Sequence, residues 1–353
     1  MLSNETLFFL AFAAFVLFIM AVDLGAFSKQ KSHVVEFKEA AIWSAIWVAL
    51  SIAFYFFLQN FGYLIHGITD MARLQEIRDK YAEHVELIPS NFTASLARFQ
   101  ANMSLEYITG YLVEYSLSAD NIFVFILIFN SFGVQQRYYK KILVWGILGA
   151  IILRMIFIFL GSALIQRFEW IMYLFGAFLV YTGIQLFFQK DEDETIEPNN
   201  HPVVRFVSKY LNVYHRNVTD HFFIRRKSDR KVFVTPLFII VIVIAFTDLV
   251  FAVDSIPAIF SITKDPYIVF FSNVFAIMGL RSMFFFLSSI MSKFRFLKVG
   301  LAVLLTFIGA KMLGEHWLAE LGFKPAYSLY VIVLILGVSV LASWLIPEKE
   351  TEA

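Results

Sequence analysis

The sequence lacks cysteine altogether and is poor in charge for its length. With no cysteine among 353 residues, disulfide bonds and thiolate metal sites are excluded. Charged residues make up 16% of the chain, whereas soluble domains carry about 25%. Hydrophobic residues reach 59% and the mean hydropathy is +0.71. The net charge of +1 gives no electrostatic basis for binding nucleic acid. These values predict a polytopic membrane protein.

Several functional motifs are absent as well. The sequence contains no glycine-rich phosphate-binding loop of the nucleotide-driven pumps, which argues against primary pumping. No cofactor motif supports enzymatic redox chemistry, so we expect no enzyme activity and no prosthetic group. The N-terminus lacks the basic stretch that opens a signal peptide, and its apolar run is long. We therefore expect a retained first membrane helix.

Long apolar runs predict an all-α fold with about nine transmembrane helices, because a helix needs about 20 apolar residues to cross a bilayer. The predicted spans are 6–27, 40–58, 105–132, 142–165, 170–188, 235–262, 266–291, 296–313 and 327–346. They divide the chain into two first helices (1–59), a polar segment (60–104), a first repeat (105–188), a loop (189–234), a second repeat (235–314) and a last helix with a tail (315–353).

The two long polar segments are expected to lie outside the bilayer. In the first, apolar residues recur at three- and four-residue spacing from Met71 to Val85, which predicts an amphipathic surface helix. The second segment, 189–234, reads as a solvated loop that carries a short helix. Lys and Arg favour cytoplasmic loops; nineteen of them fall on one side of the predicted topology and seven on the other. This asymmetry predicts an N-terminus outside and a C-terminus in the cytoplasm.

Two related acidic motifs interrupt the apolar runs. One reads Glu114-Tyr-Ser-Leu-Ser-Ala-Asp120-Asn121, and the other reads Asp248-Leu-Val-Phe-Ala-Val-Asp254-Ser255. A charged side chain at the centre of a membrane helix costs about 2.5–3.5 kcal/mol on insertion scales, so such residues are rare and usually functional. We expect the two motifs to form one intramembrane cation site.

The motifs belong to a longer internal repeat. Arg154 follows the first motif by one helix, as Arg281 follows the second. One helix later, Gly183 with Gln185 corresponds to Gly309 with Lys311. The third to fifth predicted helices therefore resemble the sixth to eighth, and they would start on opposite sides of the membrane. Inverted repeats of this kind place the binding site of many secondary transporters at the midplane.

The ligand chemistry of the motifs favours a hard divalent cation. Carboxylates, hydroxyls and backbone carbonyls suit Mg²⁺, Ca²⁺ and Mn²⁺. Because Glu114 and Asp120 would point about 120° apart on a regular helix, we expect a local unwinding between them, and Pro257 would help to break the second motif's helix. Arg154, Arg281 and Lys311 would balance the acids, permanently or when the site is empty. Asp23, near the end of the first span, is either part of this charge balance or merely interfacial. Buried acid–base pairs can also be purely structural.

At these residues the chain resembles the TerC family, and most closely its longer Alx-type members. The matching segments run from Leu105 to Phe125 and from Phe246 to Ala258. The resemblance extends over nearly the whole chain, and residues 189–234 are its weakest part. It implies an inner-membrane protein related to the LysE-type transporter superfamily. Alx-type members are linked to manganese export and to the alkaline-pH response. The family name comes from tellurite-resistance operons, and plant relatives are linked to thylakoid protein insertion.

The leading hypothesis is therefore a secondary transporter that exports Mn²⁺, with Ca²⁺ and Mg²⁺ as alternatives and the coupling ion left open. The family's acidic positions fall on Glu114, Asp120, Asp248 and Asp254, and Asn121 and Ser255 would add neutral ligands. The alternative is a membrane scaffold or insertion factor, or a tellurite-resistance-associated protein, in which the acids are structural. The expected partners are the cation and the lipid bilayer of a bacterial inner membrane, with no nucleic acid; protein partners are left open.

Overall fold

The computed structural model describes residues 4–23, 37–168, 170–188, 204–205, 209, 213, 221–225, 232–288, 296–314, 317–318 and 325–345. Its long helices are α1 (Asn4–Asp23), α2 (Phe37–Phe61), α5 (Phe92–Ser131), α6 (Tyr139–Arg167), α7 (Ile171–Phe188), α9 (Pro236–Phe260), α10 (Pro266–Ser288), α11 (Leu297–Leu313) and α13 (Pro325–Leu345). Shorter elements are α3 (Tyr63–His66), α4 (Met71–Tyr81), the 3-10 helix η1 (Gln136–Tyr138), and the strands β1 (Phe223–Arg225) and β2 (Val232–Val234).

These elements confirm the all-α polytopic fold class. Within the described ranges, five helices are long and apolar enough to cross a membrane, namely α1, α2, α6, α9 and α10. Three more apolar helices, in α7, α11 and α13, are shorter. The amphipathic helix is also confirmed as α4, whose buried residues are Leu74, Ile77 and Tyr81. Asp70 caps its first turn by accepting a hydrogen bond from the amide of Arg73 at 2.8 Å, which satisfies one of the free N–H groups at a helix start.

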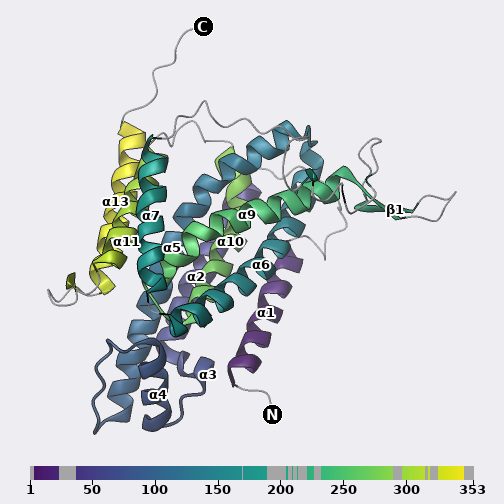
Figure 1. Cartoon of the computed structure of the whole chain (residues 1–353). Helices are drawn as coiled ribbons and strands as arrows, with labels where there is room; N and C mark the ends of the chain where they lie inside the picture. The colour runs from purple at the N-terminus through teal and green to yellow at the C-terminus, as the bar shows by residue number, and fades with distance from the viewer. Residues whose placement is uncertain are drawn as a thin grey trace.

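The bundle has two distinct ends (Figure 1). We call the end that carries α3 and α4 the α4 end, and the opposite one, near the antiparallel β1–β2 pair, the hairpin end. Helix α1 begins at the α4 end, where Gly67 lies against the side chain of Asn4. Helix α13 finishes at the hairpin end, where Ser343 accepts a hydrogen bond from the amide of Phe296 just before α11. The first and last helices therefore start and finish on opposite sides of the bundle.

The two predicted repeats run in opposite directions. Helix α5 starts beside α4, whereas α9 starts next to the hairpin (Figure 1). The contacts between the repeats follow the same symmetry. The first helix of each repeat packs on the second helix of the other, α5 on α10 and α9 on α6, and the two third helices, α7 and α11, pack on each other. This is the pattern expected of an inverted repeat with α5–α7 in one copy and α9–α11 in the other.

Glycines allow α7 and α11 to approach closely. A Cβ added to Gly309 of α11 would lie 2.6 Å from the carbonyl oxygen of Gly176 and 2.7 Å from the amide nitrogen of Val180. A Cβ on Gly183 of α7 would lie 2.4 Å from the hydroxyl of Thr306 and 2.8 Å from a backbone carbonyl of α11. Small residues at such crossings let membrane helices pack backbone to backbone. The aligned glycines of the repeat therefore meet at one interface.

We expect Gly309→Ala to destabilise the folded protein by about 1–3 kcal/mol, because the added methyl group overpacks against backbone atoms that cannot rotate away. Thermal unfolding in detergent measures the effect. Gly337→Ala in α13 is the matched control, since a Cβ there meets nothing within 4 Å. Equal unfolding temperatures for the two variants would contradict this account of the α7–α11 contact.

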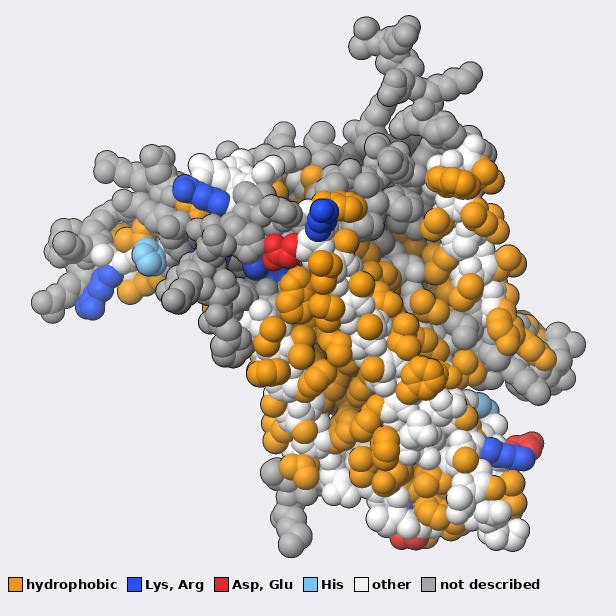
Figure 2. Space-filling model, turned by 180° about the vertical axis from the view of Figure 1, so that it is seen from behind, with side chains coloured by type: hydrophobic (Ala, Val, Ile, Leu, Met, Phe, Trp, Pro, Cys, Tyr) orange, Lys and Arg blue, Asp and Glu red, His pale blue; other side chains and the backbone are white. Residues whose placement is uncertain are grey.

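Helix α10 is the central helix of the bundle, and nearly all of its residues from Pro266 to Phe285 are buried. Phe271 and Phe275 of α10 pack on Phe12 of α1 and Phe54 of α2, with ring centroids 4.5–5.7 Å apart. Figure 2 shows the complementary outer surface: hydrophobic side chains cover the middle of the face, and charged ones gather toward its two ends. This distribution suits a bundle surrounded by lipid.

Three local predictions were wrong. Helix α5 begins at Phe92, thirteen residues before the predicted span, because Asn91 caps it by accepting a hydrogen bond from the amide of Ala94 at 3.0 Å. The helix then continues unbroken through the first acidic motif, so the expected unwinding is absent there. Helix α9 likewise continues through Pro257 and ends three residues later at Phe260. The β1–β2 pair was not predicted either; most of residues 189–234 lies outside the described part.

Candidate functional site

Four buried helices meet around the guanidinium of Arg154 on α6. Its Nε and Nη2 donate to the two carboxylate oxygens of Asp248 on α9, at 2.8 and 3.1 Å. Its Nη1 donates to Glu114 on α5 and, at 2.6 Å, to the carbonyl oxygen of Asn273 on α10. Helices α5 and α9, the first of each repeat, thus each supply one acid to a single base.

Hydrogen bonds with neighbouring groups orient the side chains around Arg154. Asp248 and the guanidinium form a two-point pair, the strongest arrangement for an arginine and a carboxylate. The amide nitrogen of Asn273 donates to the carbonyl of Val269 at 2.9 Å, so its oxygen faces Arg154. Ser118, one turn after Glu114, donates to that carboxylate at 3.4 Å. The cluster is therefore ordered by hydrogen bonds from all four helices.

The charges of this cluster do not balance. Glu114, Arg154 and Asp248 expose at most 2% of their surface, and two carboxylates face one guanidinium. Several described polar side-chain atoms are buried without a hydrogen-bond partner, and two of them belong to predicted ligands: the Oε2 atom of Glu114 in this cluster and the hydroxyl of Ser255 further along α9. Unpaired buried oxygens are unfavourable, and they are also free to bind a cation. The described part of the cluster therefore holds one more acid than base, which is a formal charge of −1.

The other predicted site residues are placed as follows. Arg281 is buried on α10, and the ammonium of Lys311 donates to the carbonyl of Ser261 at the C-terminal end of α9, at 3.0 Å. Lysine is favourable there because a helix C-terminus is partially negative. The side chains of Asp23, Asp120, Asn121 and Asp254 lie outside the described part of the structure. Within that part, no group of three acidic or histidine side chains is arranged to hold a metal ion.

Comparison with known proteins identifies the family of this chain. The family model described as "Integral membrane protein TerC family" matches residues 99–351, which include the whole Arg154 cluster. The chain belongs to the TerC family. It is 39% identical over 302 residues to an Escherichia coli K12 protein provisionally named membrane-bound redox modulator Alx, covering 86% of this chain and 84% of that one.

Two further relatives of this TerC-family protein carry only general names. An uncharacterized membrane protein of Myxococcus xanthus, STKORF319, is 40% identical over 332 residues, which cover 94% of this chain and 90% of the relative. An uncharacterized membrane protein of Rickettsia bellii is 43% identical over 244 residues, 69% of this chain and 78% of the relative. No solved structure matches the chain. The comparisons support an Alx-like TerC membrane protein.

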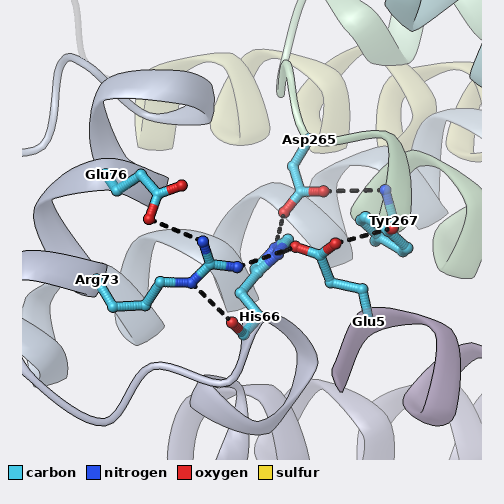
Figure 3. A network of polar contacts seen from close by, with 6 residues as sticks. All are labelled: Glu5, His66, Arg73, Glu76, Asp265 and Tyr267. Carbon is cyan, nitrogen blue, oxygen red and sulfur yellow. Dashed lines mark hydrogen bonds and ion pairs between the residues drawn. The ribbon is translucent and has the colours of Figure 1, made fainter. Parts of the chain in front are cut away.

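The TerC-family protein also has a second buried polar cluster, at the α4 end, which the sequence did not predict (Figure 3). The ring nitrogens of His66 bond the carboxylates of Glu5 on α1, at 3.1 Å, and Asp265 before α10, at 2.8 Å. Arg73 of α4 lies 3.5 Å from Glu5 and donates to the backbone carbonyl of His66 at 3.2 Å. Tyr267 donates to Glu5 at 3.4 Å. We call these residues the His66 cluster.

The His66 cluster joins α1, α3, α4 and α10, and it lies beyond the end of the span 37–61. Burial lowers the pKa of His66, but the charge of Asp265 and the hydrogen bonds to Asp265 and Glu5 outweigh burial and raise the pKa to about 9. The ring is therefore positively charged at neutral pH. A sequence signal existed: Glu5 and Asp265 are acids at the starts of apolar runs, where helix N-termini favour negative charge.

Proposed function

We propose that this TerC-family protein is a secondary transporter that exports a divalent cation, Mn²⁺ foremost, across the bacterial inner membrane. The observation that carries the proposal is the meeting of Glu114 and Asp248, one from each inverted repeat, on the single guanidinium of Arg154 in the buried core. Inverted repeats place the sites of many secondary transporters in this position.

In this proposal the guanidinium of Arg154 pairs with Glu114 and Asp248 while no cation is bound there. A divalent ion that enters displaces the guanidinium from Glu114 and Asp248, whose oxygens suit hard cations. The ion exchanges one positive charge for two, which removes the deficit of about one charge in the described cluster. The choice of Mn²⁺ over Ca²⁺ and Mg²⁺ follows from the resemblance to Alx-type members. We further propose that the α4 end faces outward, as the distribution of Lys and Arg predicts.

We expect Asp248→Asn and Glu114→Gln each to lower divalent-cation flux in proteoliposomes about tenfold or more per folded protein, since each replaces a carboxylate ligand of a hard divalent cation by a neutral amide. A panel of Mn²⁺, Ca²⁺ and Mg²⁺ in wild-type vesicles identifies the cargo. Glu86→Gln, a change at an exposed acid, is the matched control. Wild-type flux indistinguishable from protein-free vesicles, or unchanged flux in both variants, would disprove the proposal.

The Arg154 cluster is also compatible with a scaffold or insertion role, because every nitrogen of its guanidinium is already bonded. In that case Asp248→Asn lowers the amount of folded protein in the membrane but leaves no cation-dependent phenotype in the protein that remains. In the transporter, the same variant leaves enough folded protein to measure, and the cells accumulate the cation. Measuring folded protein and cellular Mn²⁺ in one strain separates the two functions.

A further inference from the structure

A cavity of about 470 Å³ opens at the α4 end of the bundle. It lies between α4, α6, α7, the loop after α9, and α11. The polar residues that line it are Lys80, Glu83, Ser162, Gln166 and Lys264. At about 30 Å³ per water molecule, the cavity has room for a cation with its complete first hydration shell.

The floor of this cavity continues the buried face of α6 that carries Arg154. Residues 154, 158, 162 and 165 of α6 recur at three- and four-residue spacing and are all buried. Ser162 and residue 165 line the cavity. Eight residues separate Ser162 from Arg154, which is about 12 Å along the helix at 1.5 Å per residue. The cavity and Arg154 thus lie about 12 Å apart along α6, with Ile158 at an intermediate level.

Two buried apolar side chains, Phe260 and Ile158, lie close to the floor of the cavity. Phe260, in the last turn of α9, lines the cavity and exposes only 2% of its surface. Its ring reaches across to α6, because a Cβ on Gly161 would lie 3.5 Å from the Phe260 Cε2 atom. Ile158 is completely buried one turn below Ser162. Apolar constrictions of this kind block hydrated ions by excluding water.

We propose that this cavity is the vestibule through which the cation leaves the Arg154 cluster, and that Phe260 and Ile158 close it in the present conformation. This inference rests on the proposed transport function and on the outward orientation of the α4 end. Both sides of the closure come from transporting helices: α6 supplies Arg154 and Ile158, and α9 supplies Asp248 and Phe260. A relative movement of α6 and α9 therefore opens the vestibule and rearranges the cluster together.

The chemistry of the vestibule suits release rather than tight binding. Its floor offers the neutral oxygens of Ser162 and Gln166, and the side-chain amide nitrogen of Gln166 donates a hydrogen bond to the Ser162 hydroxyl at 3.0 Å. The charged residues Lys80, Glu83 and Lys264 are exposed, so salt screens them. A hydrated divalent cation meets no pair of carboxylates there, and conduction requires sites weak enough for the ion to depart.

The absence of cysteine makes the test direct. Ser162→Cys and Leu164→Cys are expressed in intact cells and treated with a membrane-impermeant, positively charged thiol reagent. Leu164 lies on the same helix but on its outer surface, 41% exposed. We expect the thiol at position 162 to react at least tenfold faster than the one at position 164, and its modification to block divalent-cation flux. Equal rates of thiol modification at the two positions would show that the cavity is not an open vestibule.

Variants at Ile158, one helical turn from Ser162, test whether Phe260 closes the cavity. We expect Ile158→Cys to be unreactive alone and to react at least tenfold faster when combined with Phe260→Ala, with Phe260→Leu as a milder second variant in case the alanine variant folds poorly. A rate at position 158 that neither change at position 260 alters would refute the gate. These labelling rates do not depend on transport. If the unlabelled protein moves no divalent cation, the proposed function fails, whereas normal flux with unreactive position 162 refutes the vestibule alone.

Discussion

Arg154→Met is expected to destabilise the folded protein by about 3–5 kcal/mol, because breaking a buried ion pair leaves uncompensated charge. Removal of the guanidinium leaves both Glu114 and Asp248 buried and without their base. The change appears as a large drop in the unfolding temperature in detergent and as less protein in the membrane. Arg98→Met is the control, since Arg98 is exposed and surface changes usually stay within about 0.5 kcal/mol.

A variant without charged side chains in the cluster distinguishes the effect of buried charge on stability from the effect of packing. The triple variant Glu114→Gln, Arg154→Met, Asp248→Asn has no buried charge left in the described cluster, so we expect it to recover much of the stability that Arg154→Met loses. It should still move no divalent cation, because both acidic ligands are gone. An Arg154→Met protein as stable as the Arg98→Met control would show that the cluster is not held together as the structure indicates.

Raising the pH from about 6.5 to 9.5 is expected to remove about 3 kcal/mol of stability that comes from His66. Its pKa is about 9 in the folded protein and about 6.5 in an unfolded chain, and each unit corresponds to about 1.4 kcal/mol. Because the folded pKa is the higher one, the contribution is complete below pH 6.5 and disappears as the pH rises through 9. The measurement is the unfolding free energy of the purified protein against pH.

The variant His66→Gln isolates this contribution, because glutamine keeps a hydrogen-bonding side chain but does not titrate in this range. Its stability should be lower than that of the wild type at pH 6.5 and should approach it near pH 9.5. His221→Gln, at an exposed histidine near β1, should follow the wild-type curve. A wild-type curve parallel to that of His66→Gln over this interval would show that the ring is not charged between Glu5 and Asp265.

The two polar clusters are connected through α10. Asp265 stands just before the first residue of this helix, and Asn273 lies eight residues later, about 12 Å along the axis. Asp265 bonds His66, and Asn273 accepts from Arg154. Helix α10 and the residue just before it therefore contribute side chains to both clusters.

Periodicity and charge in the sequence were enough to predict much of this architecture. Apart from α5, the long apolar runs became helices at nearly the predicted bounds, because a segment that must satisfy its backbone within the bilayer has few alternatives to a helix. The acids at 114 and 248 were predicted to meet an arginine because an unpaired charge is unfavourable in hydrocarbon. The predictions were wrong near helix ends: α5 begins earlier than predicted, after its cap Asn91, and α9 does not break at Pro257.

The sequence by itself determined that this chain spans a membrane and that it carries an inverted pair of acidic motifs, because composition and spacing are local properties of the chain. Its place among the TerC proteins came from the resemblance of those motifs to the family. Only the tertiary structure decided which acids share Arg154, that His66 lies between Glu5 and Asp265, and that Phe260 lines the same cavity as Ser162. These are contacts between residues far apart in the chain, and the packing of the helices alone selects them.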